Sequence, residues 1–410
     1  MSANFIVGLD VGSQNIKAAI AEVRKDGKLA VIKLIKTPSG GIRKGLVDDT
    51  AEAARALTQI MGEIKKVSKS AAKNIFLGVG SHDVKVQASR GIVAVSRADS
   101  EIHQDDVDRV VEASQALNLP PNRTVLHSLT QEFVVDGVGD VRDPLGMIGS
   151  RLEVNSLIVD AFAPSIKDAT KCIEIVGGGV SGLVFSPLAA ARSVLSKAQK
   201  ELGVVLIDIG SGKTGISLYE ENKLVHASVF PVGSGNVTND LAIGMKCSVG
   251  VAELVKFSFG SALAKEVPAR EAVDLRKIDP AAKGTVTRRL IAEIIEVRLA
   301  EIMEFVENEL KRFNKARKLP AGAVIVGGGA KIPGIVELTR QELHLSAQIG
   351  IPDISALALA GPDLQLQVED PEFACAIGLL QIGSDKANTK IIGQSQTGGF
   401  FRNLFKHFIP

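Results

Sequence analysis

The sequence predicts an α/β protein built from two related domains, and three observations lead to this fold class. First, LDVGSQNIKAAIAEV at residues 9–23 recurs in altered form as IDIGSGKTGISLYE at residues 207–220. Second, Asp10 and Asp208 of the two copies lie 198 residues apart, about the length of one domain. Third, both halves show the same order of predicted elements, three strands and then a helix.

Each half has three short segments typical of strands, followed by apolar residues at helical spacing. In the first half the expected strands and helix are, in order, residues 5–9, 16–23, 29–36 and 48–67. In the second half they are residues 204–209, 215–219, 224–231 and a helix near 235–243. Because the whole unit repeats, the similarity of the two hairpins indicates a duplicated domain.

Residues 86–162 separate the two units and are interpreted as an inserted subdomain. We expect a helix at 104–117, strands at 124–127 and 132–135, and a flexible Gly/Asp/Pro-rich loop at 136–149. Further along, a long amphipathic helix is expected from Val286 to about Phe313. The polar segment at 383–399 has the composition of a linker.

Composition describes an ordinary globular protein of 410 residues, with 45% hydrophobic and 23% charged residues. The net charge is only +2, so the basic excess of a general nucleic-acid binder is missing and no nucleic-acid partner is expected. Cys172, Cys247 and Cys375 have no CxxC spacing and fit a reducing cytosol. The N-terminus has no secretion signal and no apolar stretch is long enough to span a bilayer. The sequence therefore predicts a cytoplasmic protein, or one attached to a membrane from the cytoplasmic side.

The two hairpins have the chemistry of phosphate-binding turns. A tight turn after a strand exposes successive backbone N–H groups, and Gly and Ser allow phosphate oxygens to approach closely. Asp10 and Asp208 stand at the strand ends, where they are placed to hold Mg²⁺, through water. Further donors would come from both turns: Ser13, Gln14, Asn15, Lys17, Gly212, Lys213 and Thr214. A single such hairpin is as consistent with an ordinary turn as with a phosphate-binding one, but two in matched contexts indicate one nucleotide held between two domains.

Three glycine-rich segments need separate interpretations. GSGKT at 210–214 is not a P-loop, because Ile207 stands where GxxxxGK[ST] requires Gly and a strand follows. The triplet at 177–179 follows a predicted helix and is interpreted as a helix C-cap. The triplet at 327–329 leaves the buried strand expected at 323–326, where glycines let the backbone approach a base or ribose. Its spacing is not GxGxxG, so it is not a Rossmann motif.

With these motifs the sequence resembles the FtsA family of bacterial cell-division proteins, within the actin-like ATPase superfamily. The resemblance runs from about Phe5 to Gly383. Besides the hairpins, it rests on these segments: GIRKGLVDD at 41–49, VLHSLTQEF at 125–133, VGSGNVTNDLA at 232–242, IAEIIEVRLAEI at 291–302 and GGGAKIPG at 327–334. The implied fold is actin-like: two ribonuclease-H-like domains with inserted subdomains flanking a nucleotide cleft. The implied cofactors are ATP and Mg²⁺.

The resemblance also implies domain boundaries. The first core domain (1A) would comprise residues 1–85, 163–199 and 373–383, and the inserted subdomain (1C) residues 86–162. The second core domain (2A) would comprise 200–230 and 305–372, and its subdomain (2B) residues 231–304. Residues 384–397 would be a flexible linker and 398–410 an amphipathic membrane-targeting helix.

Carried onto this chain residue by residue, the family's nucleotide site takes in both hairpins, the turn at 233–236, a helix carrying Glu253 and Lys256, and the second glycine triplet. The implied nucleotide-binding residues are Asp10, Gly12, Ser13, Gln14, Asn15, Lys17, Asp208, Gly210, Ser211, Gly212, Lys213, Thr214, Gly233, Gly235, Asn236, Glu253, Lys256, Gly327, Gly328, Gly329, Ala330, Ile332 and Pro333. Two departures stand out. Ser211 and Lys213 give GSGKT where GGGT is common. Ser186 replaces the acid that precedes Pro in hydrolytically active relatives such as MreB, so we expect slow ATP hydrolysis at most.

The C-terminal segment FFRNLFKHFIP predicts an interfacial membrane helix. One half of the helical wheel is apolar, with Phe400, Phe401, Leu404, Phe405, Phe408 and Ile409. The other half is polar, with Arg402, Asn403, Lys406 and His407. Large apolar groups opposite cations fit binding to anionic lipid. The alternative, a helix docked on the protein's own body, would leave the long polar linker unexplained.

The resemblance implies a peripheral protein on the cytoplasmic face of the cell membrane, at the division site. It would bind anionic lipid, polymerise with itself, anchor the C-terminal tail of FtsZ and recruit later division proteins. Arg288, Arg289 and Arg298 on the long helix are the residues expected to contact the FtsZ tail. Two alternatives stay open. One is a scaffold like the pilus-assembly protein PilM, but that function would not explain the terminal helix. The other is a small-metabolite kinase, for which no catalytic acid is identified.

Overall fold

Two related β-sheets form the body of the protein. The structure is a computed structural model that describes residues 4–24, 26, 28–280, 282, 284–355, 357–361 and 363–392, without the side chains of 386–392. The first sheet has the strand order β11-β6-β1-β2-β3-β19. Its strands are β1 (Asn4–Val11), β2 (Asn15–Val23), β3 (Leu29–Pro38), β6 (Ile75–Val79), β11 (Val180–Phe185) and β19 (Leu357–Leu359).

The second sheet, with the order β14-β13-β12-β17-β18, repeats the first. Its strands are β12 (Val204–Ile209), β13 (Thr214–Glu220), β14 (Lys223–Phe230), β17 (Ala323–Val326) and β18 (Ala347–Ile349). In both sheets the first strand pairs antiparallel with the next and parallel with a later strand, β6 or β17. The predicted duplicated α/β fold is therefore confirmed at the level of strand pairing.

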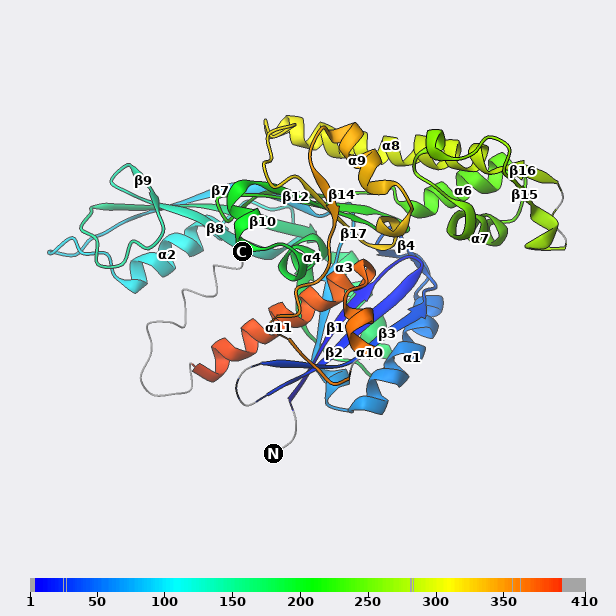
Figure 1. Ribbon diagram of the computed structural model, residues 1–410. Coiled ribbons are helices and arrows are strands. Elements are labelled where there is room, and N and C mark those ends of the chain that lie inside the picture. The colour runs from blue at the N-terminus through cyan, green and yellow to red at the C-terminus, as the bar shows by residue number, and fades with distance from the viewer. Residues whose placement is uncertain are drawn as a thin grey trace.

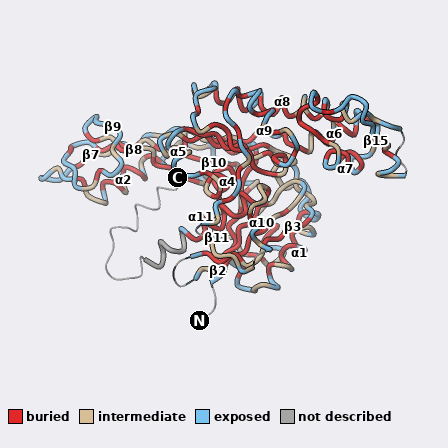
Figure 2. Tube along the Cα trace, viewed as in Figure 1, coloured by how far each residue is buried: buried red, intermediate tan, exposed pale blue. Residues whose placement is uncertain are grey.

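Helices cover both sheets and fill the space between them. They are α1 (Thr50–Val67), α3 (Ala163–Ile175), α4 (Ser186–Val194), α5 (Lys197–Leu202), α9 (Ile335–Leu343), α10 (Asp363–Val368) and α11 (Ala374–Ile392). Short connections are β4 (Ile42–Arg43), β5 (Leu46–Val47), η1 (Ala71–Lys73), η4 (Gly328–Lys331) and η5 (Pro371–Phe373). Asp49 caps α1, where its side chain accepts a hydrogen bond from Glu52 N. Figure 2 shows the buried residues concentrated where these helices meet the sheets.

The inserted subdomain is a four-stranded antiparallel sheet, β7-β10-β8-β9, covered by one helix. Its elements are β7 (Lys85–Ala94), α2 (Gln104–Gln115), β8 (Arg123–Val135), β9 (Val138–Val141) and β10 (Arg151–Phe162). The two strands predicted at 124–127 and 132–135 are one strand, β8, whose two register shifts against β10 break the alternation of apolar residues.

The loop predicted at 136–149 is also partly ordered. Asp136 and Gly137 both have positive φ and turn the chain from β8 into β9, which is the geometry favoured by Asp-Gly hairpin turns. The Asp136 carboxylate accepts hydrogen bonds from the backbone N–H groups of Ser150 and Arg151, and these bonds lower its pKa.

At the other end of the molecule a mainly helical subdomain follows β14 (Figure 1). It contains α6 (Ser234–Met245), α7 (Val249–Phe259), η2 (Ala264–Glu266), β15 (Ala272–Asp274), η3 (Leu275–Lys277) and β16 (Thr285–Thr287). The predicted long helix is α8 (Arg288–Arg312), which continues from this subdomain into the second core domain and crosses the predicted boundary at 304/305 without interruption.

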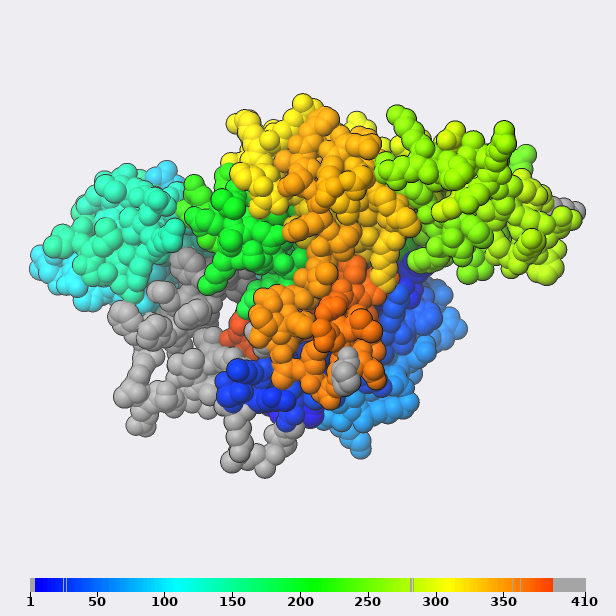
Figure 3. All heavy atoms as spheres, in the orientation of Figure 1, coloured from blue at the N-terminus to red at the C-terminus, as the bar shows by residue number. Residues whose placement is uncertain are grey.

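The chain returns from the second domain to the first near its end. After β18 it adds β19 to the edge of the first sheet beside β3, and α11 then packs against α4 and β1. Figure 3 shows these orange residues lying across both domains. Helix α11 continues to Ile392, which differs from the linker predicted at 384–397. A helix already held by buried residues such as Leu380 extends readily into a polar segment, because adding a residue costs far less than nucleation.

Candidate nucleotide site

The two predicted phosphate turns have matching backbone geometry. In the first hairpin the Gly12 N–H donates to the Asn15 carbonyl (3.2 Å), and in the second the Gly210 N–H donates to the Lys213 carbonyl (2.9 Å). In the strand register Asp10 lies opposite Lys17, and Asp208 lies opposite Gly215. The sequence repeat is therefore a repeat of structure.

The two turns contact each other across the interface between the domains. A Cβ atom on Gly212 would lie 2.5 Å from Ser13 Oγ, so a side chain here would displace the hydroxyl of the facing hairpin. Ser13 Oγ is buried and has no hydrogen-bond partner among the described residues. The backbone N–H groups of Ser13, Gln14, Ser211 and Gly212 also form no backbone hydrogen bond with the described part of the chain. Unpaired donors facing each other from two turns fit phosphate oxygens.

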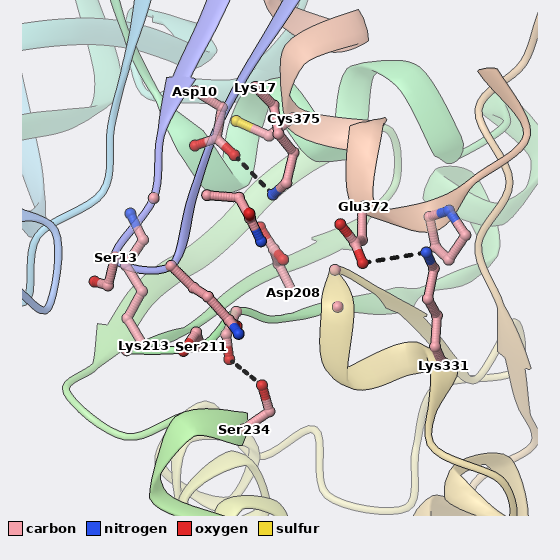
Figure 4. A pocket seen from close by; sticks show the side chains of 18 of the residues that line it. Asp10, Ser13, Lys17, Asp208, Ser211, Lys213, Ser234, Lys331, Glu372 and Cys375 are labelled. Carbon is pink, nitrogen blue, oxygen red and sulfur yellow. Dashed lines mark hydrogen bonds and ion pairs between the residues drawn. The ribbon is translucent and has the colours of Figure 1, made fainter. Parts of the chain in front are cut away.

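These turns line a cavity of about 240 Å³ between the two domains. Most predicted nucleotide-binding residues line it: Asp10, Gly12, Ser13, Gln14, Asn15, Lys17, Asp208, Gly210, Ser211, Gly212, Lys213, Glu253, Lys256, Gly327, Gly328, Ile332 and Pro333. Figure 4 shows side chains from both hairpins directed into this space. The structure thus brings together residues from widely separated parts of the sequence.

Six predicted residues do not line the cavity: Thr214, Gly233, Gly235, Asn236, Gly329 and Ala330. They shape its walls instead. Thr214 is fully buried and its hydroxyl donates to the Val232 carbonyl, while the Asn236 side chain accepts from Gly233 N at the start of α6. These residues lie behind the surface of the cavity.

Asp10, Lys17 and Asp208 form a charged group at the ends of the hairpin strands. Lys17 Nζ lies 3.4 Å from the Asp10 carboxylate. Burial, together with the nearby charge of Asp10, raises the pKa of Asp208. Burial of Lys17 opposes its charge, but the acidic groups around it, led by Asp10 and Asp208, raise its pKa overall. Two carboxylates beside unpaired phosphate donors fit Mg²⁺, which binds through one or two carboxylates, water and phosphate.

The second glycine triplet forms the opposite wall of the cavity. Gly327 has φ +84°, and a Cβ atom there would lie 2.4 Å from the Asp208 carboxylate, so the backbone passes directly beside the second hairpin. Ile332 and Pro333 continue this wall, and the partly exposed ring of Phe257 on α7 faces the same cavity. Flat apolar groups next to open backbone fit a nucleobase better than they fit phosphate.

Glu253 and Lys256 are paired on α7, and Glu253 also reaches the first domain. Its carboxylate accepts hydrogen bonds from Lys256 Nζ (2.7 Å), from Thr238 Oγ1, and from Gln14 Nε2 (2.9 Å) of the first hairpin. Burial opposes its charge, but these donors lower the pKa of Glu253. A carboxylate held in this way can accept hydrogen bonds from ribose hydroxyls while it joins the two sides of the cavity.

Several lining residues were not predicted from the sequence: Lys36, Gly80, Ser234, Phe257, Lys331, Pro371, Glu372 and Cys375. Glu372 is the clearest example. Its carboxylate lies 2.5 Å from Lys36 Nζ on β3 and 3.1 Å from Lys331 Nζ on η4, so it links the two domains beside the cavity. Nothing in the local sequence marks Glu372 as part of the site. Its partner Lys331 lies more than 40 positions away along the chain, and Lys36 lies more than 300 positions away. Cys375 is buried, which raises the pKa of its thiol and keeps it neutral.

The substitution Glu372→Gln is expected to lower the free energy of unfolding by about 1 kcal/mol at pH 7, since one of its lysine partners is well exposed. Burial opposes the charge of Glu372, but Lys36, Lys17 and Lys331 lower its pKa below the ordinary value of 4.5. Its ionised form therefore stabilises the fold above pH 4.5, and this contribution is lost as the pH falls further. Urea unfolding at pH 7 and at pH 4 should show a gap between wild type and variant that shrinks in acid; a gap of constant size would contradict this assignment.

The three arginines predicted to contact a partner lie at and after the start of α8. Arg288 pairs with Glu271, and Arg289 donates to the Val267 carbonyl. Arg298 forms an ion pair with Asp240 of α6 (2.6 Å) and also contacts Glu301, so it is not a free cation. The hydrogen bond with Asp240 raises the pKa of Arg298, against the smaller opposing effect of burial.

The predicted membrane residues, Phe400 to Ile409, lie outside the described residues. In the part of the chain that is described, none of the helices combines the length and the apolar character needed to cross a bilayer.

Comparison with known proteins identifies relatives over nearly the whole chain. A family model described as "Cell division protein FtsA" matches residues 205–378, and one described as "SHS2 domain inserted in FTSA" matches residues 81–160. The cell division protein FtsA of Pseudomonas aeruginosa is 33% identical over 385 residues, covering 94% of this chain and 90% of the relative.

Solved structures of lower sequence identity share the fold. The structure of a PilM–PilN type IV pilus biogenesis complex matches with a TM-score of 0.65 and 18% identity, covering 92% of this chain and 98% of that one. MreB5 of Spiroplasma citri bound to AMPPNP matches with a TM-score of 0.57 and 13% identity, covering 96% and 99%. These likenesses confirm the predicted actin-like fold.

Proposed function

The chain belongs to the FtsA family of bacterial cell-division proteins, and from this premise we propose that it is an ATP-binding adaptor that anchors FtsZ to the cytoplasmic face of the membrane at the division site. The observation that carries the nucleotide part is the pair of facing hairpins, with their unpaired N–H groups and two carboxylates in one cavity. The AMPPNP bound by MreB5, a protein of the same fold, supports it. Mg²⁺ would be held by Asp10 and Asp208, through water.

Nucleotide would act mainly as an assembly ligand. Ser186 stands at the start of α4 beside the cavity, where hydrolytically active relatives carry an acid that helps to position water. A serine hydroxyl is neutral at pH 7 and is a poor base, so turnover would be slow. ATP would then keep the two domains joined while the protein polymerises and recruits later division proteins.

The FtsZ tail would bind the helical subdomain near Arg298. Ile243 on α6 and Val297 on α8 are exposed on the two helices that the Arg298–Asp240 ion pair joins. Apolar groups beside a cation fit a peptide that is both acidic and apolar. The amphipathic segment 398–410 would bind anionic lipid weakly, and polymerisation would supply avidity.

Liposome co-sedimentation with FtsZ, ATP and Mg²⁺ tests both attachments together. The full chain should carry FtsZ into the pellet of anionic liposomes, whereas a chain ending at Gly399 should leave both proteins in the supernatant. The Arg298→Glu variant should still pellet with the liposomes, but about tenfold less FtsZ should be found in the pellet. This corresponds to a loss of about 1.4 kcal/mol in the free energy of FtsZ binding. Asp240→Asn is the matched control, because it removes the same ion pair but keeps the arginine.

The experiment tests the attachment to the membrane and the attachment to FtsZ separately. Equal pelleting of the full and shortened chains would rule out the membrane helix. Unchanged FtsZ recovery with Arg298→Glu, or equal loss with Asp240→Asn, would rule out a direct contact by the arginine. A protein that pellets with liposomes but never with FtsZ would favour a scaffold of the PilM kind. ATP-dependent phosphorylation of a small metabolite would favour the kinase alternative.

A further inference from the structure

Lys213 reaches from the second hairpin to the first domain. A Cβ atom placed on Gly80 would lie 2.4 Å from Lys213 Nζ, and one placed on Gly45 would lie 3.3 Å from it. Gly80 follows β6 and Gly45 lies in the turn between β4 and β5, so both belong to the first domain. A side chain at Gly80 would displace this ammonium group, and one at Gly45 would touch it.

No carboxylate of the described residues lies within ion-pair distance of this ammonium group. Among the described residues Lys213 Nζ forms no ion pair and no hydrogen bond, although Lys17, Lys36, Lys256 and Lys331 in the same cavity are all paired. The charge of Lys213 nevertheless acts on the cavity, because it counts among the influences that lower the pKa of Asp208 against the effect of burial. An unpaired cation in a cavity lined by phosphate donors is placed to receive an anion.

Ser186 lies at the same point of the cavity. Its Oγ would be 2.9 Å from the same Cβ position on Gly80 that Lys213 Nζ approaches. Ser186 is almost fully buried; among the described residues its hydroxyl forms no hydrogen bond with nitrogen or oxygen, and the Cys375 thiol is its polar neighbour. A buried hydroxyl without a described nitrogen or oxygen partner, beside an ammonium group outside any described ion pair, is a second donor for the same anion.

The position of this pair selects one part of a nucleotide. Figure 4 places Lys213 and Lys331 on opposite sides of the cavity. Lys331 lies next to Ile332 and Pro333 on the wall suited to a base, whereas Lys213 belongs to the second hairpin. A nucleotide bound with its base on that wall and its phosphates on the hairpins would direct its terminal phosphate toward Lys213 and Ser186.

We propose that Lys213 Nζ and Ser186 Oγ bind the third phosphate of a nucleoside triphosphate, so that this chain prefers ATP over ADP through a cation of its own second hairpin. The proposal rests on the proposed nucleotide site and adds to it the residues that distinguish the two nucleotides. This chain offers the phosphate a cation and a neutral hydroxyl, an arrangement that holds the terminal phosphate without supplying a base. The site would therefore retain ATP.

Equilibrium titration of the full chain with fluorescent N-methylanthraniloyl ATP and ADP, each with Mg²⁺, tests the proposal. The wild type should bind the ATP probe at least about tenfold more tightly, since a hydrogen bond to a charged group is worth that much. Lys213→Gln should weaken the ATP probe about tenfold, change the ADP probe less than about twofold, and so remove the preference. Lys213→Arg keeps the charge and should retain the preference to within about threefold.

Lys331→Gln is the matched control, because it removes a lysine from the opposite wall and should affect both probes alike. Thermal unfolding of each variant confirms that it folds. Equal weakening of both probes by Lys213→Gln, or no weakening at all, would overturn the proposal while leaving the nucleotide site intact. A wild-type chain that binds neither probe would overturn the nucleotide site itself, and the proposal with it.

Discussion

Replacing Gly378 with Ala is expected to lower the free energy of unfolding by about 3 kcal/mol, the upper end of the usual cost of overpacking. Gly378 lies where α11 crosses α4, and an added Cβ atom would lie 1.7 Å from the Ala189 carbonyl oxygen. The obstacle is backbone, so no rotation of a side chain can relieve it and the two helices must separate. Urea unfolding followed by circular dichroism measures the loss.

Gly62→Ala is the matched control for this substitution. Gly62 is also in a helix interior, but it is exposed on α1 and a Cβ atom there would meet nothing within 4 Å. Alanine has the better helix propensity, so this change should raise the free energy of unfolding by about 0.5–1 kcal/mol. If both variants moved in the same direction by similar amounts, the close approach of α11 and α4 would not be the cause.

The substitution Asp208→Asn is expected to have opposite effects on binding and on stability. Loss of one of the two carboxylates proposed to hold Mg²⁺ should weaken binding of ATP by roughly 100-fold. The same change should stabilise the nucleotide-free protein by about 1 kcal/mol at pH 7.5, because it removes a charge that is buried and lies near Asp10. Nucleotide titration and thermal unfolding measure the two effects independently.

The pH dependence of the second effect follows from the raised pKa of Asp208, caused by its burial and by Asp10. A carboxyl with a raised pKa stabilises the fold in its protonated form, and that contribution is lost as the pH rises through the folded pKa. Asparagine resembles the protonated form, so the advantage of the variant should grow from pH 5 to pH 7.5. Asp136→Asn is the control with the opposite sign, because hydrogen bonds from Ser150 and Arg151 lower the pKa of Asp136. A variant at Asp208 that is less stable than wild type at pH 7.5 would contradict this account.

The fold was predictable from the sequence where local pattern and three-dimensional structure coincide. The hairpins at Asp10 and Asp208 satisfy this condition, because strand, turn and strand are consecutive in the chain and occur twice. Strand β8 does not satisfy it, since its register shifts against β10 disturb the alternation that marks a strand. The end of α11 was missed for a related reason: the residues after Gly383 are polar, and the helix there extends from a buried segment rather than from a pattern of its own.

The site was predictable to the same extent. Residues next to glycine turns, such as Ser13 and Gly327, could be proposed because the turn itself is visible in the sequence. Glu372 could not, because its lysine partners come from β3 and η4 and only the packed structure brings them together. Lys213 was visible as a departure from a motif, but its approach to Gly80 required the position of the other domain.

The return of the chain to the first domain determines the order in which the protein can be completed during synthesis. The first sheet receives its edge strand, β19, and its central covering helix, α11, from residues that are synthesised after the second domain. The second domain lies between these parts in the sequence and can assemble while they are still inside the ribosome. The first domain is therefore completed after the second, and until then the apolar residues that will pack against α11, Ile6 and Phe76 among them, stay accessible to chaperones.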